Sequence, residues 1–392
     1  MNRWLSGFAV VSASLSLGGP SAAAPARAPT CDEGDVTQIS AGFRHACAVR
    51  ADHSLWCWGF NFDGELGTGD HTYEYVPTQV TALGNTVRSV AASVQHTCAV
   101  TLDRSLWCWG DNTSGELGNG TTTNSLVPIE VAGLEHSVAS VAVGSNTTCV
   151  IKNDHSLWCW GASYNGQLDA GGTGNVLTPA PIIGLEGTKI AAISLLTDQC
   201  ALDEDGAVYC WGDNQNGALG QGDLVSRYTP TPVSALTAPI RTIAAHGEAP
   251  CALDIYGNVS CWGENNEGEV GDGSNIPTYP FAVPSPVALT TIPHTVDLAV
   301  GTIAACAIQR GGQLSCWGSN YSGELGVGDT TDRYSPTAVA LPGATSVSIG
   351  EGFACATDDH RNLYCWGDNS LGQLGAGAGV TGSLVPLQVT MP

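Results

Sequence analysis

Short runs of alternating apolar and polar residues recur along the chain and predict β-strands throughout. The segment from Cys98 to Cys108 is apolar at both ends and polar in its centre, a pattern typical of a β-hairpin that turns near Asp103. With 50 glycines and 20 prolines, the composition suits many short strands joined by tight turns rather than long helices. Four strands are expected in this unit, at about Val87–Ser93, Thr97–Leu102, Leu106–Gly110 and Val127–Val131.

The cysteines repeat with the hairpins. Fourteen of the fifteen form pairs whose members lie ten positions apart, and each second cysteine is followed by Trp-Gly. Folding each hairpin about its centre places the two cysteines opposite each other, where Cα atoms in antiparallel strands are about 4.5–5.5 Å apart. That separation suits a disulfide, so we predict one in every unit. The predicted bonds are Cys47–Cys57, Cys98–Cys108, Cys149–Cys159, Cys200–Cys210, Cys251–Cys261, Cys306–Cys316 and Cys355–Cys365.

Zinc binding and unbonded thiols are the two alternative roles for these cysteines. Zinc ligands usually lie two to four residues apart on a tight knuckle, which the spacing of ten does not match. Unbonded thiols would fit a reducing cytosol, whereas the N-terminal segment considered below indicates export to an oxidising compartment. The fifteenth cysteine, Cys31, has no partner at this spacing, and either an unbonded thiol or an intermolecular link is open for it.

The repeat predicts a ring. The tryptophans that follow the second cysteines recur in seven units at steps of about 50 residues, from Trp58 to Trp366. Seven such units predict an all-β, seven-bladed β-propeller of four-stranded antiparallel blades. Because the link from the fourth strand to the next unit is short, we expect each blade to combine the fourth strand of one unit with three strands of the next. The C-terminal segment Val385–Val389 would then complete the first blade, closing the ring by pairing of the N- and C-terminal strands in a monomer.

In Trp107-Cys108-Trp109, strand alternation places both rings on one face and the sulfur on the other. We therefore expect the disulfide of one blade to lie against the tryptophan layer of the next. The loops between third and fourth strands repeat glycines at fixed positions, which form turns, and a leucine between them, Val270 in the fifth unit, anchors the loop to the core. These loops lack the dense carboxylate pattern of a calcium site.

Charge and the N-terminus limit the function. The formal net charge is −23, which disfavours binding to nucleic acid or to anionic lipid and permits a basic partner. Arg3, a short apolar run and small residues up to Ala24 predict a signal peptide at 1–24. A short linker at 25–35 and a propeller at 36–392 follow, with no membrane span. We expect a secreted or periplasmic protein.

Three motifs, Gly-x-x-His-x-Cys-Ala-Val, Leu-Trp-Cys-Trp-Gly and Asn-x-x-Gly-Glu-Leu-Gly-x-Gly, together resemble the RCC1 repeat family between Val36 and Val389. The resemblance implies a seven-bladed propeller. Family members act as nucleotide-exchange factors for small GTPases, as chromatin-docking proteins, as a plant ultraviolet sensor and as secreted bacterial inhibitors of β-lactamases. The chain has no long wedge-like insertion and no basic tail, and Phe43 stands where the sensor motif has tryptophan. Export and acidity make the secreted inhibitors the nearest analogy.

No catalytic, cofactor or metal site is predicted. His45 and His96 occupy equivalent positions, but the other units carry no histidine there, so a ring of metal ligands is not expected. Neither a nucleophile elbow nor a phosphate-binding loop is present in the sequence. An enzyme that uses carboxylates across the central channel stays open as an alternative.

The fifth and sixth units are separated by a longer, proline-rich segment at 271–293. It carries Tyr279 and Phe281, which we predict as contacts for a protein partner because rigid aromatics make good interface anchors. A tolerated surface insertion is the other interpretation. The sequence thus predicts an exported, non-enzymatic binding scaffold. The alternatives are a regulator of a small GTPase that resembles the exchange factors and a secreted enzyme inhibitor.

Overall fold

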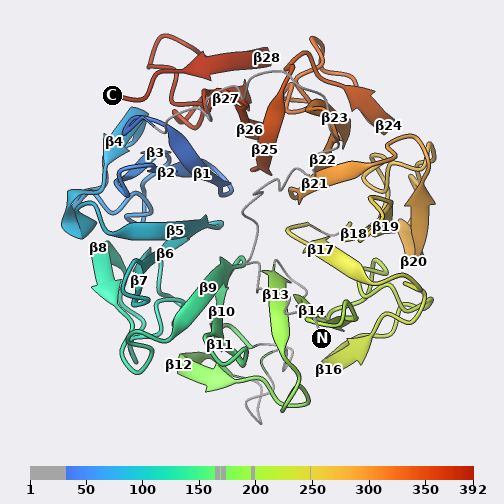
Figure 1. Cartoon of the computed structure of the whole chain (residues 1–392), viewed down its shortest axis with the longest axis horizontal. Coiled ribbons are helices and arrows are strands. Elements are labelled where there is room, and N and C mark those ends of the chain that lie inside the picture. Colours follow the sequence, from blue (N-terminus) through green and yellow to red (C-terminus); the bar gives the residue numbers. More distant parts are fainter. Residues whose placement is uncertain (1–31, 164–167, 169–173, 196–198, 248) are drawn as a thin grey trace, which may run out of the picture.

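The computed structural model describes residues 32–392 except 164–167, 169–173, 196–198 and 248. Its strands form seven four-stranded antiparallel sheets arranged as blades around a common centre (Figure 1). The predicted all-β, seven-bladed propeller is therefore confirmed. The predicted signal peptide and Cys31 lie outside the described residues.

Every blade consists of four strands that follow one another in the chain. The innermost strands are β1 (Val36–Ala41), β5 (Val87–Ala92), β9 (Val138–Val143), β13 (Ile190–Leu195), β17 (Ile240–Ala244), β21 (Thr295–Val300) and β25 (Ala344–Ile349). The second strands are β2 (His45–Arg50), β6 (His96–Thr101), β10 (Thr147–Lys152), β14 (Gln199–Asp203), β18 (Cys251–Asp254), β22 (Ala304–Gln309) and β26 (Phe353–Asp358). The third are β3 (Leu55–Gly59), β7 (Leu106–Gly110), β11 (Leu157–Gly161), β15 (Val208–Gly212), β19 (Val259–Glu264), β23 (Gln313–Gly318) and β27 (Leu363–Asp368). The outermost are β4 (Glu74–Gln79), β8 (Ser125–Glu130), β12 (Val176–Pro181), β16 (Arg227–Pro232), β20 (Ala282–Leu289), β24 (Arg333–Ala338) and β28 (Gly382–Val389); a short 3-10 turn, η1 (Thr81–Leu83), follows β4.

The prediction that each blade combines the fourth strand of one unit with three strands of the next is wrong, and so is the predicted pairing of the N- and C-terminal strands. The C-terminal strand β28 pairs with β27 of its own blade, and β1 is the edge strand of a blade that contains β2, β3 and β4. The long loop between the third and fourth strands packs against the next blade and returns to its own sheet, so its length does not mark a change of blade. The short link after the fourth strand simply leads to the next innermost strand.

The ring closes by packing and polar contacts between blades 7 and 1. The indole Nε1 of Trp58 donates to the carbonyl of Gln373 at 2.9 Å, and the backbone N–H of Ala41 donates to Ser348 Oγ at 2.9 Å. Further out, Arg50 donates to the carbonyl of Pro392 at 2.8 Å. Closure therefore repeats the contacts made between other blades, without a shared sheet.

The cysteines of each predicted pair are register partners of the second and third strands. Their Cα atoms lie 4.1–4.2 Å apart and all seven disulfides are formed, one in each blade. Such a density of disulfides is typical of proteins in oxidising compartments.

The core consists of layers between blades, as the alternation of tryptophan and cysteine predicts. Each layer combines the disulfide of one blade with the tryptophan that directly follows the second cysteine of the next blade. The last layer joins Cys355 and Cys365 of blade 7 to Trp58 of blade 1. Because every layer uses both neighbours, no blade completes its own core.

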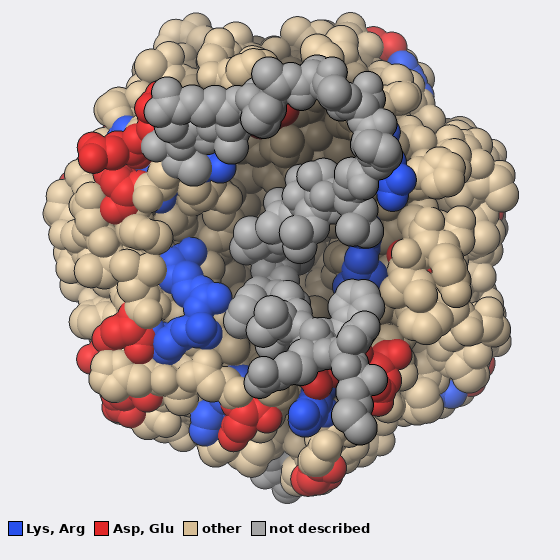
Figure 2. Space-filling view, viewed as in Figure 1, with Lys and Arg blue, Asp and Glu red and all other residues tan. Residues whose placement is uncertain are grey.

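Two faces result from the strand directions. The turns between first and second strands and the long loops between third and fourth strands form one face, which we call the loop face. The hairpin turns between second and third strands form the opposite face, the hairpin face. Lys and Arg side chains gather around the centre of the hairpin face (Figure 2). No helix among the described residues is long and apolar enough to cross a membrane.

Candidate functional site

The long loops of the loop face have one internal design, seen clearly between β23 and β24. Asn320 accepts a hydrogen bond from the backbone N–H of Leu325 at 3.0 Å and donates to the carbonyls of Asp329 and Thr331. Leu325 is fully buried, so it anchors the loop as predicted. Gly326 has φ 69° and lies against the Trp366 ring, where a Cβ atom would approach Nε1 to 2.7 Å. Each loop thus docks onto the next blade.

The glutamate before the anchoring leucine is the most unusual residue of the motif. Its carbonyl accepts the indole N–H of the next blade, as Glu324 does from Trp366 at 2.8 Å. Its side chain folds back so that one carboxylate oxygen accepts a backbone N–H two residues earlier, from Ser322 at 2.8 Å for Glu324. Four such glutamates are buried, namely Glu65, Glu116, Glu269 and Glu324.

Burial changes the acidity of these groups. Removal from water raises the pKa of Glu65, Glu269 and Glu324 to about 7. The pKa of Glu116 is also raised by burial, opposed by hydrogen bonds that include one from Asn146. The sequence identifies this glutamate only as part of a structural loop and does not predict its burial. Its recurrence directly before the buried leucine was the signal that could have identified it.

The second oxygen of the glutamate distinguishes one contact between blades from another. Between blades 2 and 3, Asn146 Nδ2 donates to Glu116 Oε1 at 3.1 Å, so both oxygens of that carboxylate are satisfied. Between blades 6 and 7, the position equivalent to Asn146, three residues before the first cysteine, is Gly352. Glu324 is only 1% exposed, and its Oε1 accepts no hydrogen bond from any residue that the structure describes.

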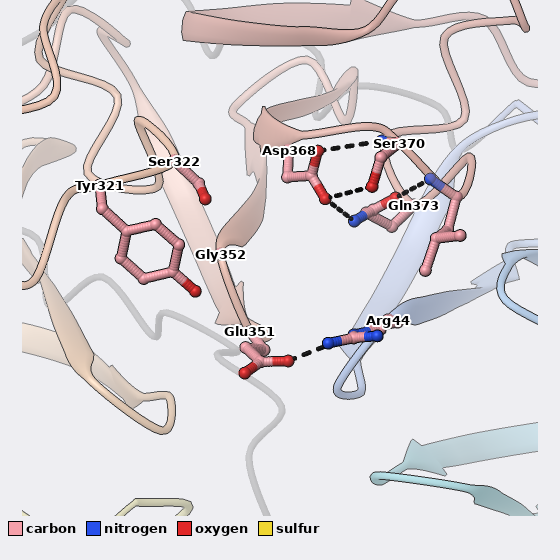
Figure 3. Close-up of a pocket in the computed structure, with 9 residues that line it drawn as sticks. Arg44, Tyr321, Ser322, Glu351, Gly352, Asp368, Ser370 and Gln373 are labelled. Atoms are coloured by element: carbon pink, nitrogen blue, oxygen red, sulfur yellow. Dashed lines mark hydrogen bonds and ion pairs between the residues drawn. The ribbon is translucent and has the colours of Figure 1, made fainter.

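A pocket of about 300 Å³ lies beside Gly352, and Glu324 is not among the residues that line it. Tyr321 and Ser322 of the β23–β24 loop approach it from one side, and Asp368 and Gln373 of blade 7 from the other (Figure 3). Its lining residues are Arg44, Tyr321, Ser322, Glu351, Gly352, Asp368, Ser370, Leu371 and Gln373.

Ionisable groups dominate the pocket. Arg44, from the turn after β1, pairs with Glu351 at 3.3 Å across the mouth (Figure 3). Burial raises the pKa of Glu351, and the Arg44 charge opposes that rise. The pKa of the Tyr321 hydroxyl is raised by burial and by the charges of Glu351 and Glu324. The lining therefore carries two carboxylates, of Glu351 and Asp368, and one cation, Arg44.

Asp368 is already engaged. Its carboxylate accepts the backbone N–H and hydroxyl of Ser370 and the side-chain amide of Gln373. Gln373 holds the position that a glutamate holds in the loop of blade 6, and its Oε1 accepts the backbone N–H of Leu371 at 2.9 Å. A neutral amide thus fits the same loop geometry.

The predicted partner contacts lie on the same face. Tyr279 is 68% exposed, and its ring meets Phe281 edge-on with centroids 5.8 Å apart. Both residues belong to the loop between β19 and β20, and the backbone of Phe281 bonds to Thr278 and Asn265. The loop therefore presents an aromatic pair from an ordered backbone. Whether the pair touches a partner is a prediction.

The equivalent histidines are structural. His45 Nε2 lies 2.9 Å from Thr97 Oγ1 of the next blade, and His96 Nε2 lies 2.9 Å from Thr148 Oγ1. Burial lowers the pKa of His45 to about 4 and of His96 to about 3, so both rings are neutral at physiological pH.

Within the described residues, one group of three side chains has the spacing of a metal site, Asp358, Asp359 and His360 in the hairpin turn of blade 7. Asp358 there accepts backbone N–H groups from His360 and Asn362 and the side-chain amide of Asn362. These hydrogen bonds show that the Asp358 carboxylate stabilises the hairpin turn.

Fold and site together define a repeat-built propeller whose loop face carries an acidic pocket. Five stretches match the model of the "Regulator of chromosome condensation (RCC1) repeat", at 52–100, 103–151, 154–195, 205–253 and 311–357, more than half of the chain. A second model of the repeat matches 36–65, 87–116, 138–167 and 344–373. The chain belongs to the RCC1 repeat family.

Known relatives agree with this assignment. The chain is 29% identical to the "Ultraviolet-B receptor UVR8" of Arabidopsis thaliana, over 80% of this chain and 72% of that protein. It is 30% identical to the "RCC1 domain-containing protein RUG3, mitochondrial" of the same plant, over 72% of this chain and 67% of that protein.

Solved structures support the fold. Prp20p of Saccharomyces cerevisiae superposes with a TM-score of 0.76 at 20% identity, covering 92% of this chain and 88% of that one. Human WBSCR16 superposes with a TM-score of 0.72 at 21% identity, covering 80% and 84%.

Proposed function

We propose that this chain is an exported, non-enzymatic binding scaffold that presents its loop face to a basic protein partner. The charge of that face carries the proposal. Three arginines of the described residues lie there, and each already pairs with a carboxylate of the chain: Arg44 with Glu351, Arg227 with Asp223 and Arg333 with Asp329. Further carboxylates add negative charge to these loops: Asp63 accepts the side-chain amides of Gln95 and Asn124, and Asp111 accepts the hydroxyl of Thr113.

The other Lys and Arg residues that the structure describes support this distribution of charge between the two faces. They lie toward the hairpin face, at strand ends or in turns: Arg50, Arg88, Arg104, Lys152, Lys189, Arg241, Arg310 and Arg361. The loop face therefore attracts a basic protein and repels phosphate backbones, which supports a protein partner over nucleic acid.

Export is part of the proposal. Seven disulfides suit an oxidising environment, and the predicted signal peptide at 1–24 supplies a route. Native protein analysed by mass spectrometry without reducing agent should lack this leader and retain seven disulfides. An intact leader with reduced cysteines would instead support an intracellular role, such as regulation of a GTPase.

The binding function is tested by capture from an extract of the source organism's cell envelope. We expect a stoichiometric basic partner, which is lost when Tyr279 and Phe281 are both changed to serine. The matched control is Tyr256→Ser, since Tyr256 is 69% exposed on the hairpin face of the same blade. Equal loss in both variants, or no loss in the double variant, would contradict a contact at this loop.

A further inference from the structure

The loop between β3 and β4 of blade 1 carries aromatic residues where the loops of other blades carry polar ones. Phe60 directly follows the Trp-Gly pair, and Tyr73 directly precedes β4. The residues equivalent to Phe60 in blades 2, 4, 6 and 7 are Asp111, Asp213, Ser319 and Asp368. The residues equivalent to Tyr73 in blades 2, 4 and 6 are Asn124, Ser226 and Asp332. Blade 1 thus replaces a recurring pair of polar side chains with a pair of aromatic ones.

The loop of blade 1 does not need these rings for its backbone structure. In blade 2, the polar residue before the fourth strand accepts a backbone N–H from the start of the loop, as Asn124 does from Asn112 at 2.9 Å. In blade 1, Asn61 accepts the backbone N–H of Leu66 at 3.0 Å and donates to the carbonyl of Asp70 at 3.0 Å. These are the same bonds that order the loop between β23 and β24. The aromatic residues are therefore additions to a loop that is already stabilised.

The rings of the blade 1 loop pack together as an aromatic cluster of Phe60, Phe62 and Tyr73. The ring centroids of Phe60 and Tyr73 lie 5.0 Å apart, and the Phe62 ring lies 6.3 Å from that of Phe60, inclined to it by 21°. Phe60 and Tyr73 are half-buried, whereas Phe62 is 63% exposed. The backbone N–H of Phe60 donates to the carbonyl of Arg44 at 2.9 Å, so the turn after β1 holds the base of the cluster. An exposed ring that is backed by two others in an ordered loop is typical of an interface anchor.

The charge beside the aromatic cluster is negative. Asp63 directly follows Phe62, and its carboxylate accepts the side-chain amides of Gln95 and Asn124 from blade 2. Burial and the charge of Asp111 raise the pKa of Asp63, so carboxylates of two blades act on each other beside the rings. These carboxylates are bonded within the chain and attract a partner through their charge alone. The surface is therefore complementary to a group that combines apolar atoms with a positive charge.

An arginine side chain has both properties. Its stem covers apolar surface, and its guanidinium group is attracted to the face of an aromatic ring. The chain contains this arrangement beside the cluster, where the guanidinium carbon of Arg44 lies 5.3 Å from the centre of the Phe43 ring and Nε pairs with Glu351 at 3.3 Å. A guanidinium is planar and more weakly hydrated than an ammonium, so it stacks on a ring more readily than a lysine does.

We infer that Phe62, backed by Phe60 and Tyr73, is an anchor on which an arginine side chain of the basic protein partner stacks. The inference rests on the proposed function, because it names a second place at which that partner engages the loop face. The cluster is separate from Tyr279 and Phe281, which belong to blade 5 on the other side of the ring of blades (Figure 1).

The test is an NMR titration of the folded protein with acetyl-Ala-Arg-Ala-Arg-Ala-amide, following the backbone amides of Phe62 and Asp63. A citrulline peptide of the same length keeps the shape of the side chain and removes its charge, and a leucine peptide offers apolar atoms alone. We expect the arginine peptide to bind about fivefold more tightly than either control peptide.

Substitutions locate the anchor. Phe62→Ser should weaken binding of the arginine peptide about fivefold, and Phe62→Leu should weaken it nearly as much, because an apolar side chain without a ring has no cation–π contact. The matched control is Tyr321→Ser, since Tyr321 holds the equivalent position in the blade 6 loop and is 60% exposed. Ser319 stands there in place of Phe60, so this variant should leave the affinity within about twofold. All three variants should unfold at the wild-type temperature, because the replaced rings are exposed.

Equal binding of the citrulline or leucine peptide, or unchanged binding by Phe62→Ser or Phe62→Leu, would overturn the inference. Self-association that Phe62→Ser abolishes would overturn it as well, because a second copy of the chain would then cover the cluster. A captured partner whose binding is unchanged by Phe62→Ser would overturn the anchor alone. Binding of the arginine peptide at Phe62 without any captured protein would contradict the proposed function alone.

Discussion

The contacts between blades 2 and 3 and between blades 6 and 7 share a core and differ in their polar layer. Trp160 and Trp366 are equally buried, and each donates to the carbonyl of a glutamate in the preceding loop. Asn146 completes the first polar layer, whereas Gly352 leaves the second open. The difference teaches that one residue in a turn can convert a structural contact into a pocket without disturbing the hydrophobic layer beneath.

The largest test of this comparison removes the tryptophans. Trp160→Ala and Trp366→Ala should each lower the free energy of unfolding by about 3–5 kcal/mol, because each leaves a large cavity in a layer between blades. Urea unfolding followed by circular dichroism would measure both. If one variant loses less than about half of the unfolding free energy that the other loses, the two hydrophobic layers are not equivalent.

The disulfides test the same layers. Replacing Cys98 and Cys108 together by alanine affects the layer of blades 2 and 3, and replacing Cys306 and Cys316 affects that of blades 6 and 7. Each pair should cost about 2–3 kcal/mol, since a short loop in the unfolded chain is released. Urea unfolding under non-reducing conditions would measure it. A decrease in unfolding free energy in only one of the two double variants would show that the two layers are not equivalent.

Removal of the hydrogen bond between Asn146 and Glu116 should lower the free energy of unfolding by a smaller amount. Asn146→Gly removes the donor from Glu116 Oε1 and should lower the free energy of unfolding by about 1–3 kcal/mol at pH 8. The pKa of Glu116, measured by carboxyl NMR, should rise. The matched control is Gln95→Gly, which removes a donor that does not reach the equivalent Glu65. No pKa change in Asn146→Gly would show that the bond to Glu116 is unimportant.

The smallest effect concerns protonation. Burial raises the pKa of Glu324 to about 7, so the folded state binds a proton that the unfolded state releases. Its contribution to stability is present below the unfolded pKa near 4.5 and is lost as the pH rises through about 7. Glu324→Gln removes this loss and should be more stable than the wild-type chain by about 1 kcal/mol at pH 8, with the advantage shrinking toward pH 5. Thermal unfolding at the two pH values would measure it, and an advantage independent of pH would contradict the assignment.

The recurring cysteine and tryptophan positions were sufficient to predict the hairpins, the seven blades and the alternation of disulfide and indole. These features depend on strand period and register, which a repeated sequence displays directly. The strand content of a blade was predicted wrongly because the length of a loop does not reveal which blade it covers. The family repeat at 52–100 itself spans β3, β4, β5 and β6, so its boundaries do not coincide with those of a blade.

The pocket was not predictable in the same way. It depends on Gly352, Tyr321 and Arg44, which belong to three blades and lie far apart in the chain. Glycine at position 352 attracts no notice in a chain with 50 glycines. Only the comparison of equivalent positions in the folded ring shows that a donor is missing there.

The absence of a shared strand between the first and last blades has a practical consequence for engineering. Because β1 and β28 belong to different sheets and Arg50 contacts the carbonyl of Pro392, a short peptide could join position 36 to position 392 without breaking a sheet. New ends could then be placed in any link between a fourth strand and the next first strand. Circular permutation would thus cut the ring at an interface of the investigator's choice, including the one that borders the pocket.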